Sequence, residues 1–231
     1  MDDKTRGTFT DPRDGKVYKT VRIGGVVWMA ENLNFAAEGS VCYENDEANG
    51  DKYGRLYDWE TAKKACPDGW RLPTEEEWTA LVDYAGGVAA GTTLKSTAGW
   101  NEGPYHGING MGNGTDDFGF SALPGGNGSG NGNFHEAGIR GNWWSATELN
   151  ANRAFGRSIS YSTDYVDSSG RSINILKMIR EYAGRSGRNI GIKTLLSDSS
   201  LDIKTRLRSV MSIMGIAKKT LLRSVRCVQD E

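Results

Sequence analysis

The chain has few of the residues on which catalytic and metal sites depend, and it has no long apolar run. Its 231 residues include two histidines, His106 and His135, both in glycine-rich stretches. No apolar run approaches the roughly 20 residues that span a bilayer, so no transmembrane segment is predicted. The N-terminal residues, beginning Met1-Asp2-Asp3, have no apolar signal core, so we expect that any secretion signal was removed from this chain or never existed.

These scarcities argue against the common catalytic arrangements. A Ser/His/Asp triad needs a histidine whose tautomer is fixed by a neighbour, and neither glycine-rich stretch offers one. Zinc needs His and Cys ligands at short spacing, and none has that spacing. From these absences we expect a protein that is not an enzyme and has no cofactor.

Charge and aromatic residues are divided unevenly along the chain. The net charge is −1, yet residues 171–222 hold 11 Lys and Arg against 3 Asp and Glu, so this segment carries +8 and the rest carries −9. All seven tryptophans lie at or before Trp144. Because stacking aromatics are nearly absent from the basic segment, nucleic acid is an unlikely partner; a solvated helical face is the simpler interpretation. Alternatively, the basic segment could bind the rest of the chain, which carries −9, a separate polyanion or anionic lipid.

One helix start has a clear signature. Thr74 and Glu77 have the spacing of a capping box, in which the Thr hydroxyl accepts from the Glu77 amide and Glu77 reaches back. Trp78, Leu81, Val82 and Ala85 then fall on one helical face, and Gly86-Gly87 stops the helix. We predict a helix over 75–85, with Trp78, Leu81 and Val82 in the core and Glu75 and Glu76 exposed. A weaker pattern predicts an earlier helix over 53–65.

The middle of the chain, 86–141, is dense in glycine. Residues 127–133 (NGSGNGN) have little apolar surface to bury, and a low-complexity linker is the favoured interpretation. Strand patterns return between Asn142 and Val166.

Seven sequence blocks resemble the Fibrobacter succinogenes major paralogous domain. They follow the family's order and are 7–15 (GTFTDPRDG), 26–34 (VVWMAENLN), 52–57 (KYGRLY), 65–73 (ACPDGWRLP), 118–126 (FGFSALPGG), 143–148 (WWSATE) and 224–228 (SVRCV). Residues 70–78 (WRLPTEEEW) are also similar to the helix entry of formylglycine-generating and related sulfatase-modifying proteins.

The resemblance implies an α+β, C-type-lectin-like fold. That fold has two helices flanking small irregular antiparallel sheets, with long glycine-rich loops and adjacent terminal strands. It implies a lectin-like domain formed by 1–170 plus 223–231. The basic segment 171–222 has no counterpart in the resemblance, and the apolar stripes at 175–179 and 203–214 predict two helices inserted before the last strand.

The three cysteines can be interpreted in two ways from the residues alone. Cys66 and Cys227 have apolar neighbours, as buried reduced thiols do, and an odd count leaves at least one cysteine without an internal partner. The resemblance favours a Cys66–Cys227 disulfide and therefore an oxidising environment, extracellular or anchored at a bacterial outer membrane. Family members commonly have a cysteine near Gly50 that would pair with Cys42, and this chain has glycine there.

The candidate ligand-binding residues lie in the strand-rich part of the chain. Tyr, Trp and Arg are the residues that binding hot spots favour. By analogy with related lectin-like scaffolds we predict a binding face, with one of the two tryptophans in the core and Arg153, Tyr161 and Tyr165 exposed. The face comprises Trp143, Trp144, Arg153, Arg157, Tyr161, Asp164 and Tyr165.

The lectin calcium motifs are missing from this chain, and Trp100-Asn101-Glu102 is only a distant approach to one of them. Asn113, Asp116, Asp117 and Glu148 are weak candidates for a structural calcium ion, although loop carboxylates more often cap turns. The predicted function is a secreted or cell-surface module for adhesion to a protein or glycan ligand. A structural component of the cell surface is the alternative, and a sulfatase-modifying type of enzyme is a second one.

Overall fold

The computed structural model describes residues 6–103, 111–162, 166–168 and 217–230. It is an α+β structure with two small sheets and a few short helices, as the sequence predicts. Among the described residues no helix has the length and apolar character needed to cross a membrane. The helices predicted within the basic segment fall on residues outside this description.

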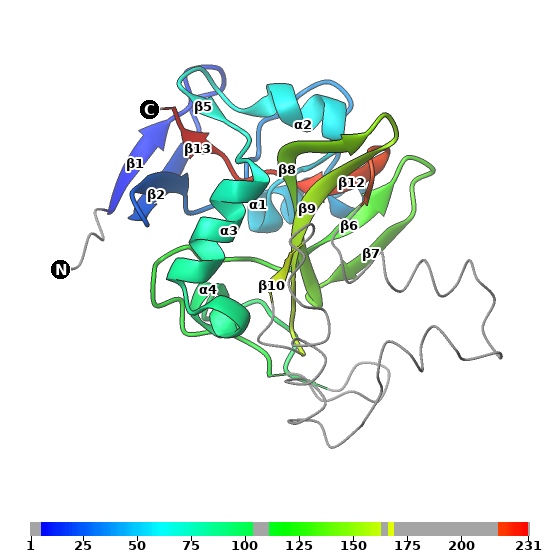
Figure 1. Cartoon of the computed structure of the whole chain (residues 1–231). Helices are drawn as coiled ribbons and strands as arrows, with labels where there is room; N and C mark the ends of the chain where they lie inside the picture. The colour runs from blue at the N-terminus through cyan, green and yellow to red at the C-terminus, as the bar shows by residue number, and fades with distance from the viewer. Residues whose placement is uncertain (1–5, 104–110, 163–165, 169–216, 231) are drawn as a thin grey trace.

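The first sheet brings the N-terminal and C-terminal strands together. Its order is β1-β2-β3-β13-β5, and each of these neighbouring strands pairs antiparallel. Figure 1 shows β13 in red among the blue N-terminal strands. The strands are β1 (Arg6–Thr10), β2 (Val17–Ile23), β3 (Val26–Met29), β5 (Trp70–Arg71) and β13 (Val228–Gln229).

The second sheet is larger and mixed. Its main path is β10-β9-β8-β12-β6-β7, with β4 on β12 and β11 on β9. β12 and β6 each run parallel to β8, whereas the other pairs are antiparallel. The strands are β4 (Leu56–Tyr57), β6 (Gly125–Ser129), β7 (Phe134–Ala137), β8 (Arg140–Asn150), β9 (Arg153–Ser160), β10 (Val166–Ser168), β11 (Ala217–Lys218) and β12 (Leu221–Ser224).

The second sheet takes in the end of the segment that we assigned to a basic insertion. Ala217 pairs with Ala154, and Leu221 and Leu222 pair with β6. Residues 217–222 therefore form part of the main body, because their backbone groups complete the edges of β9 and β6.

Helix α3 (Glu75–Tyr84) confirms the capping-box prediction. Thr74 Oγ1 accepts from the Glu77 amide, and the Glu77 carboxylate accepts from the Thr74 amide at 2.7 Å. Trp78, Leu81 and Val82 are buried in a core cluster that also contains residues of both sheets. Figure 1 shows α3 crossing between the two sheets, so its apolar face contacts both.

The range 53–65, predicted as one helix, contains the last residue of one helix, a short strand and a second helix. α1 (Glu47–Tyr53) ends at Gly54, whose φ of 77° and close contact with Asn32 leave no room for a side chain. The chain then forms β4, and Asp58 caps α2 (Trp59–Ala65) by accepting from the Thr61 amide. The remaining helical segments are η1 (Tyr43–Asn45), η2 (Gly87–Ala89) and α4 (Ala90–Leu94).

The glycine-rich run 127–133 belongs to a hairpin, so the linker interpretation is wrong. It contributes the end of β6 and the turn that leads to β7. Gly128 has no Cβ, and a Cβ there would lie 3.0 Å from the Phe134 ring. At Gly126, with φ of 67°, a Cβ would lie 2.4 Å from the His135 carbonyl oxygen. The glycines therefore permit close packing between the two strands.

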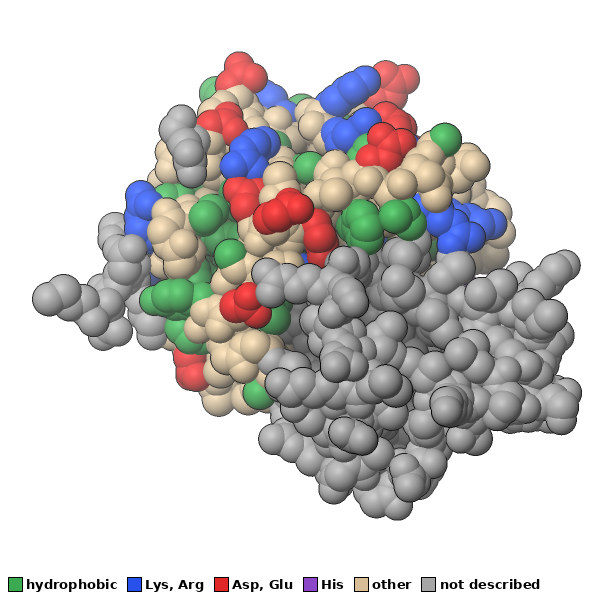
Figure 2. All heavy atoms as spheres, in the orientation of Figure 1, with side chains coloured by type: hydrophobic (Ala, Val, Ile, Leu, Met, Phe, Trp, Pro, Cys, Tyr) green, Lys and Arg blue, Asp and Glu red, His purple; other side chains and the backbone are tan. Residues whose placement is uncertain are grey.

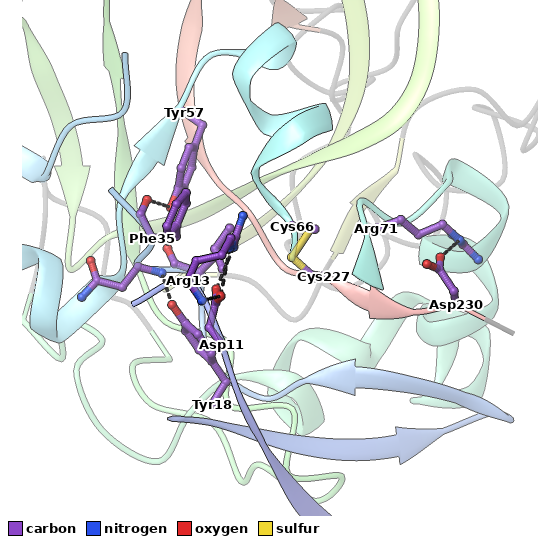
Figure 3. Close-up of a disulfide and its surroundings, with 11 residues drawn as sticks. Asp11, Arg13, Tyr18, Phe35, Tyr57, Cys66, Arg71, Cys227 and Asp230 are labelled. Atoms are coloured by element: carbon purple, nitrogen blue, oxygen red, sulfur yellow. Dashed lines mark hydrogen bonds and ion pairs between the residues drawn. A yellow bond between two sulfur atoms is a disulfide. The ribbon is translucent and has the colours of Figure 1, made fainter. Parts of the chain in front are cut away.

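A disulfide joins Cys66, at the end of α2, to Cys227, just before β13. Cys42 is buried and forms no disulfide. Near the disulfide, Figure 3 shows Asp11 against Arg13, and the Arg13 guanidinium lies 3.7 Å from the Phe35 ring centroid. The disulfide attaches α2 to the segment before β13, and the contact between Arg13 and Phe35 attaches the β1–β2 turn to the loop that follows β3.

Candidate functional site

The predicted binding face on β8 and β9 is largely buried. Trp143 and Trp144 are both fully buried, whereas only one of them was expected in the core, and Tyr161, expected to be exposed, is 3% exposed. Arg157 is also fully buried, and Arg153 is half-buried. Asp164 and Tyr165 lie outside the described residues. In this structure Trp143, Trp144, Arg157 and Tyr161 are therefore not available to a surface ligand.

Both faces of β8 are covered, and this explains the burial of both tryptophans. Trp143 faces α3, with its ring centroid 6.1 Å from that of Trp78. Trp144 points to the other side, where its indole nitrogen donates to the Tyr57 carbonyl at 2.8 Å. From that same side Trp59 donates to the Ser145 carbonyl. Alternation along a strand sends neighbours to opposite faces, but here each face meets another layer.

Arg157 has a structural role in this packing. Its Nη2 lies 2.6 Å from a carboxylate oxygen of Glu75 and donates to the Thr79 hydroxyl at 2.6 Å. The expectation that Glu75 is exposed is therefore wrong, because its side chain turns inward toward β9, whereas Glu76 is exposed as predicted. The Arg157–Glu75 pair fixes the first turn of α3 against the second sheet.

A second buried arginine, Arg226, was not singled out by sequence reasoning. Its guanidinium donates to Asn32 Oδ1 at 2.9 Å and to the carbonyls of Phe120, Ser121 and Met29. Burial lowers the pKa of Arg226 to about 9, and Glu31 and Asp116 oppose that shift. Trp143 also donates to Asn32 Oδ1, at 2.8 Å. This network joins the end of β3, the loop before β6, Trp143 of β8 and the segment just before β13.

The calcium candidates do not converge in the described structure. Asp116 accepts from the amide and hydroxyl of Ser121, and Asn113 accepts from the Trp100 amide. Glu148, near the end of β8, forms an ion pair with Lys219 at 2.7 Å. Within the described ranges no three His, Cys, Asp or Glu side chains are grouped to hold a metal ion.

Tyr84 is the one Phe, Trp or Tyr residue in the described part of the chain whose side chain is exposed. Tyr84, the last residue of α3, is 48% exposed. Its ring meets that of Phe118 edge-on, with centroids 5.6 Å apart, and Phe118 in turn packs on the core. Exposed Tyr beside a supported aromatic is a combination that ligand-binding surfaces favour.

The surroundings place a cation beside this aromatic pair. Gly119 follows Phe118 in the chain, and a Cβ built on Gly119 would lie 3.2 Å from Arg6 Nη2. The Arg6 guanidinium therefore lies directly against Gly119, where a side chain would otherwise be. Tyr84 itself lies over Gly24, in the β2–β3 turn, where a Cβ would be 3.6 Å from its ring. We call Arg6, Tyr84 and Phe118 the Tyr84 patch.

Three separate elements build the Tyr84 patch: the start of β1, the end of α3 and the loop before β6. Figure 1 shows the start of β1, the β2–β3 turn and the C-terminal end of α3 on the same side of the molecule. In Figure 2 hydrophobic side chains gather on that side, beside the end of α3. Tyr84 lies off the apolar stripe of its helix, and an aromatic residue on the polar face is the signal by which the sequence marks it.

Comparison with known proteins identifies the family. A family model described as the Fibrobacter succinogenes major domain matches residues 21–229. Because the match spans most of the chain, the protein belongs to this family, as the sequence blocks predict. No curated protein and no solved structure gives a significant match.

Proposed function

We propose that this member of the Fibrobacter succinogenes major domain family is a non-catalytic module that binds a protein or glycan ligand at the bacterial cell surface. The Tyr84 patch is the observation that carries this proposal, because it combines an exposed Tyr, a supporting Phe and a guanidinium on three elements. Such residues give a large contact area at a small cost in side-chain entropy.

The surrounding architecture supports a C-type-lectin-like scaffold and an oxidising location. The terminal strands share one sheet, α2 and α3 pack against the sheets, and a glycine-rich stretch precedes β8. The Cys66–Cys227 disulfide supports a place outside the cytoplasm, where disulfides persist. A rigid frame of this kind holds surface residues from several elements in one arrangement.

The proposal is tested on protein and glycan arrays with the full chain and two variants. Tyr84→Ala removes the exposed ring, and Leu149→Ala removes another exposed apolar side chain, from the end of β8. We expect selective hits that Tyr84→Ala loses and Leu149→Ala retains, with both variants melting as the wild type does. Hits independent of Tyr84 would move the site elsewhere. Silence across both arrays would favour a structural component of the cell surface.

A further inference from the structure

We propose that the Tyr84 patch binds glycans that carry carboxylates, such as chains of uronic acid. This inference rests on the proposed function and adds the chemical class of the ligand. It depends on two contacts of the dipeptide Phe118-Gly119: the Tyr84 ring packs against Phe118, and the Arg6 guanidinium lies against Gly119.

The aromatic part of the patch suits a sugar ring. The face of an aromatic ring carries partial negative charge, which attracts the weakly positive C–H groups on one side of a pyranose. Phe118 holds Tyr84 edge-on from the side, and the turn at Gly24 supports it from below. A ring held in this way loses little freedom when a sugar stacks on it.

The guanidinium supplies the preference for an anion. Arg6 is exposed, and among the described residues its guanidinium has no hydrogen bond or ion pair with a side chain. Arg presents parallel N–H donors that match both oxygens of a carboxylate. Arg6 and Tyr84 flank one dipeptide, so a carboxylate at Arg6 and a sugar ring on Tyr84 fit the same oligosaccharide.

The extent of the patch favours a glycan over a folded protein partner. A stable protein interface buries about 800 Å² on each side around a cluster of apolar anchors. The other exposed large apolar residues of the described chain lie elsewhere. Val17 pairs with Thr10, at the opposite end of β1 from Arg6, the Met111 amide donates to the Tyr161 carbonyl just after β9, and Leu149 lies at the end of β8. One exposed aromatic with one cation is enough for an oligosaccharide but small for a protein interface.

The test measures binding of the full chain to oligogalacturonate and to its methyl ester by calorimetry. The ester keeps the sugar rings and removes the charge. Short oligomers of alginate and hyaluronate extend the panel, and poly-glutamate supplies carboxylates without sugar rings. Variants are Arg6→Gln, Tyr84→Ala and Lys64→Gln, the last of which removes one exposed positive charge from α2, away from the patch.

We expect at least one uronate oligomer to bind and to lose about tenfold or more in affinity with Arg6→Gln and with Tyr84→Ala. Methyl esterification should have a similar effect, and Lys64→Gln should change little. The inference is overturned if no uronate oligomer binds, if the ester binds equally well, or if poly-glutamate binds in the same Arg6-dependent way. If the arrays show Tyr84-dependent binding of another ligand, the proposed function stands without this inference. If nothing depends on Tyr84, both fail.

Discussion

The carboxylate of Glu75 lies 2.6 Å from the guanidinium of Arg157, and this buried pair joins α3 to β9. The two residues are 82 positions apart in the chain, and Arg157 also donates to the Glu75 backbone carbonyl. The pair therefore sets how the capped end of α3 meets the second sheet.

Replacing Arg157 by Ala should lower the free energy of unfolding by about 3–5 kcal/mol, because it leaves a buried carboxylate without its main countercharge. Urea denaturation measures the change, and the double variant Glu75→Gln, Arg157→Met should recover part of it. Lys63→Ala, which removes an exposed pair with Glu60, is the control and should cost less than about 1 kcal/mol. A cost that small for Arg157→Ala would show that the pair contributes little.

Trp78 stands at the centre of the core between the two sheets, with Trp28, Phe120 and Trp143 around it. Trp78→Ala should cost about 3–5 kcal/mol of unfolding free energy through lost burial and a cavity. Glu76→Ala, on the exposed side of the same helix, is the matched control and should leave the urea midpoint nearly unchanged. Equal midpoints for both variants would contradict this placement of α3.

The Cys66–Cys227 disulfide closes a loop across 161 positions. Chain-entropy reasoning gives it an upper contribution of about 5 kcal/mol. Peptide mapping without reductant should find these two peptides linked. Cys42 should resist alkylation in the folded protein and react once urea unfolds it, because it is buried and burial raises the pKa of its thiol. A bridge from Cys42 to either other cysteine would refute the pairing.

Gly50 offers a site for a second disulfide. A Cβ built on Gly50 lies 2.5 Å from Cys42 Sγ, too close for a non-bonded contact. In the variant Gly50→Cys we expect oxidation to join residues 42 and 50, and the short loop should add about 2–3 kcal/mol. The intact mass without reductant should be two hydrogens lower than that of the same variant with only the Cys66–Cys227 disulfide. Gly50→Ser, which crowds Cys42 and forms no bond, should instead be destabilised. Two titratable thiols in unfolded, non-reduced Gly50→Cys would refute the expectation.

The pH dependence of stability should include a contribution from Asp11. Burial opposes the charged form of Asp11, but hydrogen bonds from Arg13 outweigh it and lower the pKa of this carboxyl below its ordinary 3.8. A lowered folded pKa gives stability that is present above the unfolded pKa and lost as pH falls through the folded value. The free energy of unfolding should therefore decline below about pH 4, and Asp11→Asn should flatten that decline. A wild-type decline that survives Asp11→Asn intact would count against this assignment.

Local features of the fold were predictable because neighbouring residues determine them. The capping box of α3 needs only Thr74 and Glu77, three positions apart, and the stripe from Trp78 to Val82 needs only helical spacing. The disulfide followed from the family resemblance rather than from spacing. Contacts with distant residues overrode the local pattern at two places. Gly54 packs against Asn32 and interrupts the helix predicted over 53–65, and pairing of β6 with β7 replaces the predicted linker.

The candidate site depended on contacts between distant segments. Alternation along β8 predicts that Trp143 and Trp144 face opposite ways, and that is what the structure has, but only the layers on both sides decide that both are buried. Arg157 and Glu75 are charged residues that a sequence pattern places at the surface. They are buried because α3 packs against β9 and the two charges pair there.

By itself the sequence determined the family and the α+β class, through blocks spread along the chain in the family's order. It also determined the start of α3 and its apolar face, because these depend on residue types within one short segment. The tertiary structure alone decided that Trp143 and Trp144 are both buried and that Arg6 lies beside Gly119. Tyr84 remains exposed because it lies off the apolar stripe of α3, and Arg6 reaches the same surface because β1 begins beside Gly119. Burial is a property of the assembled layers, and no single segment contains the information for it.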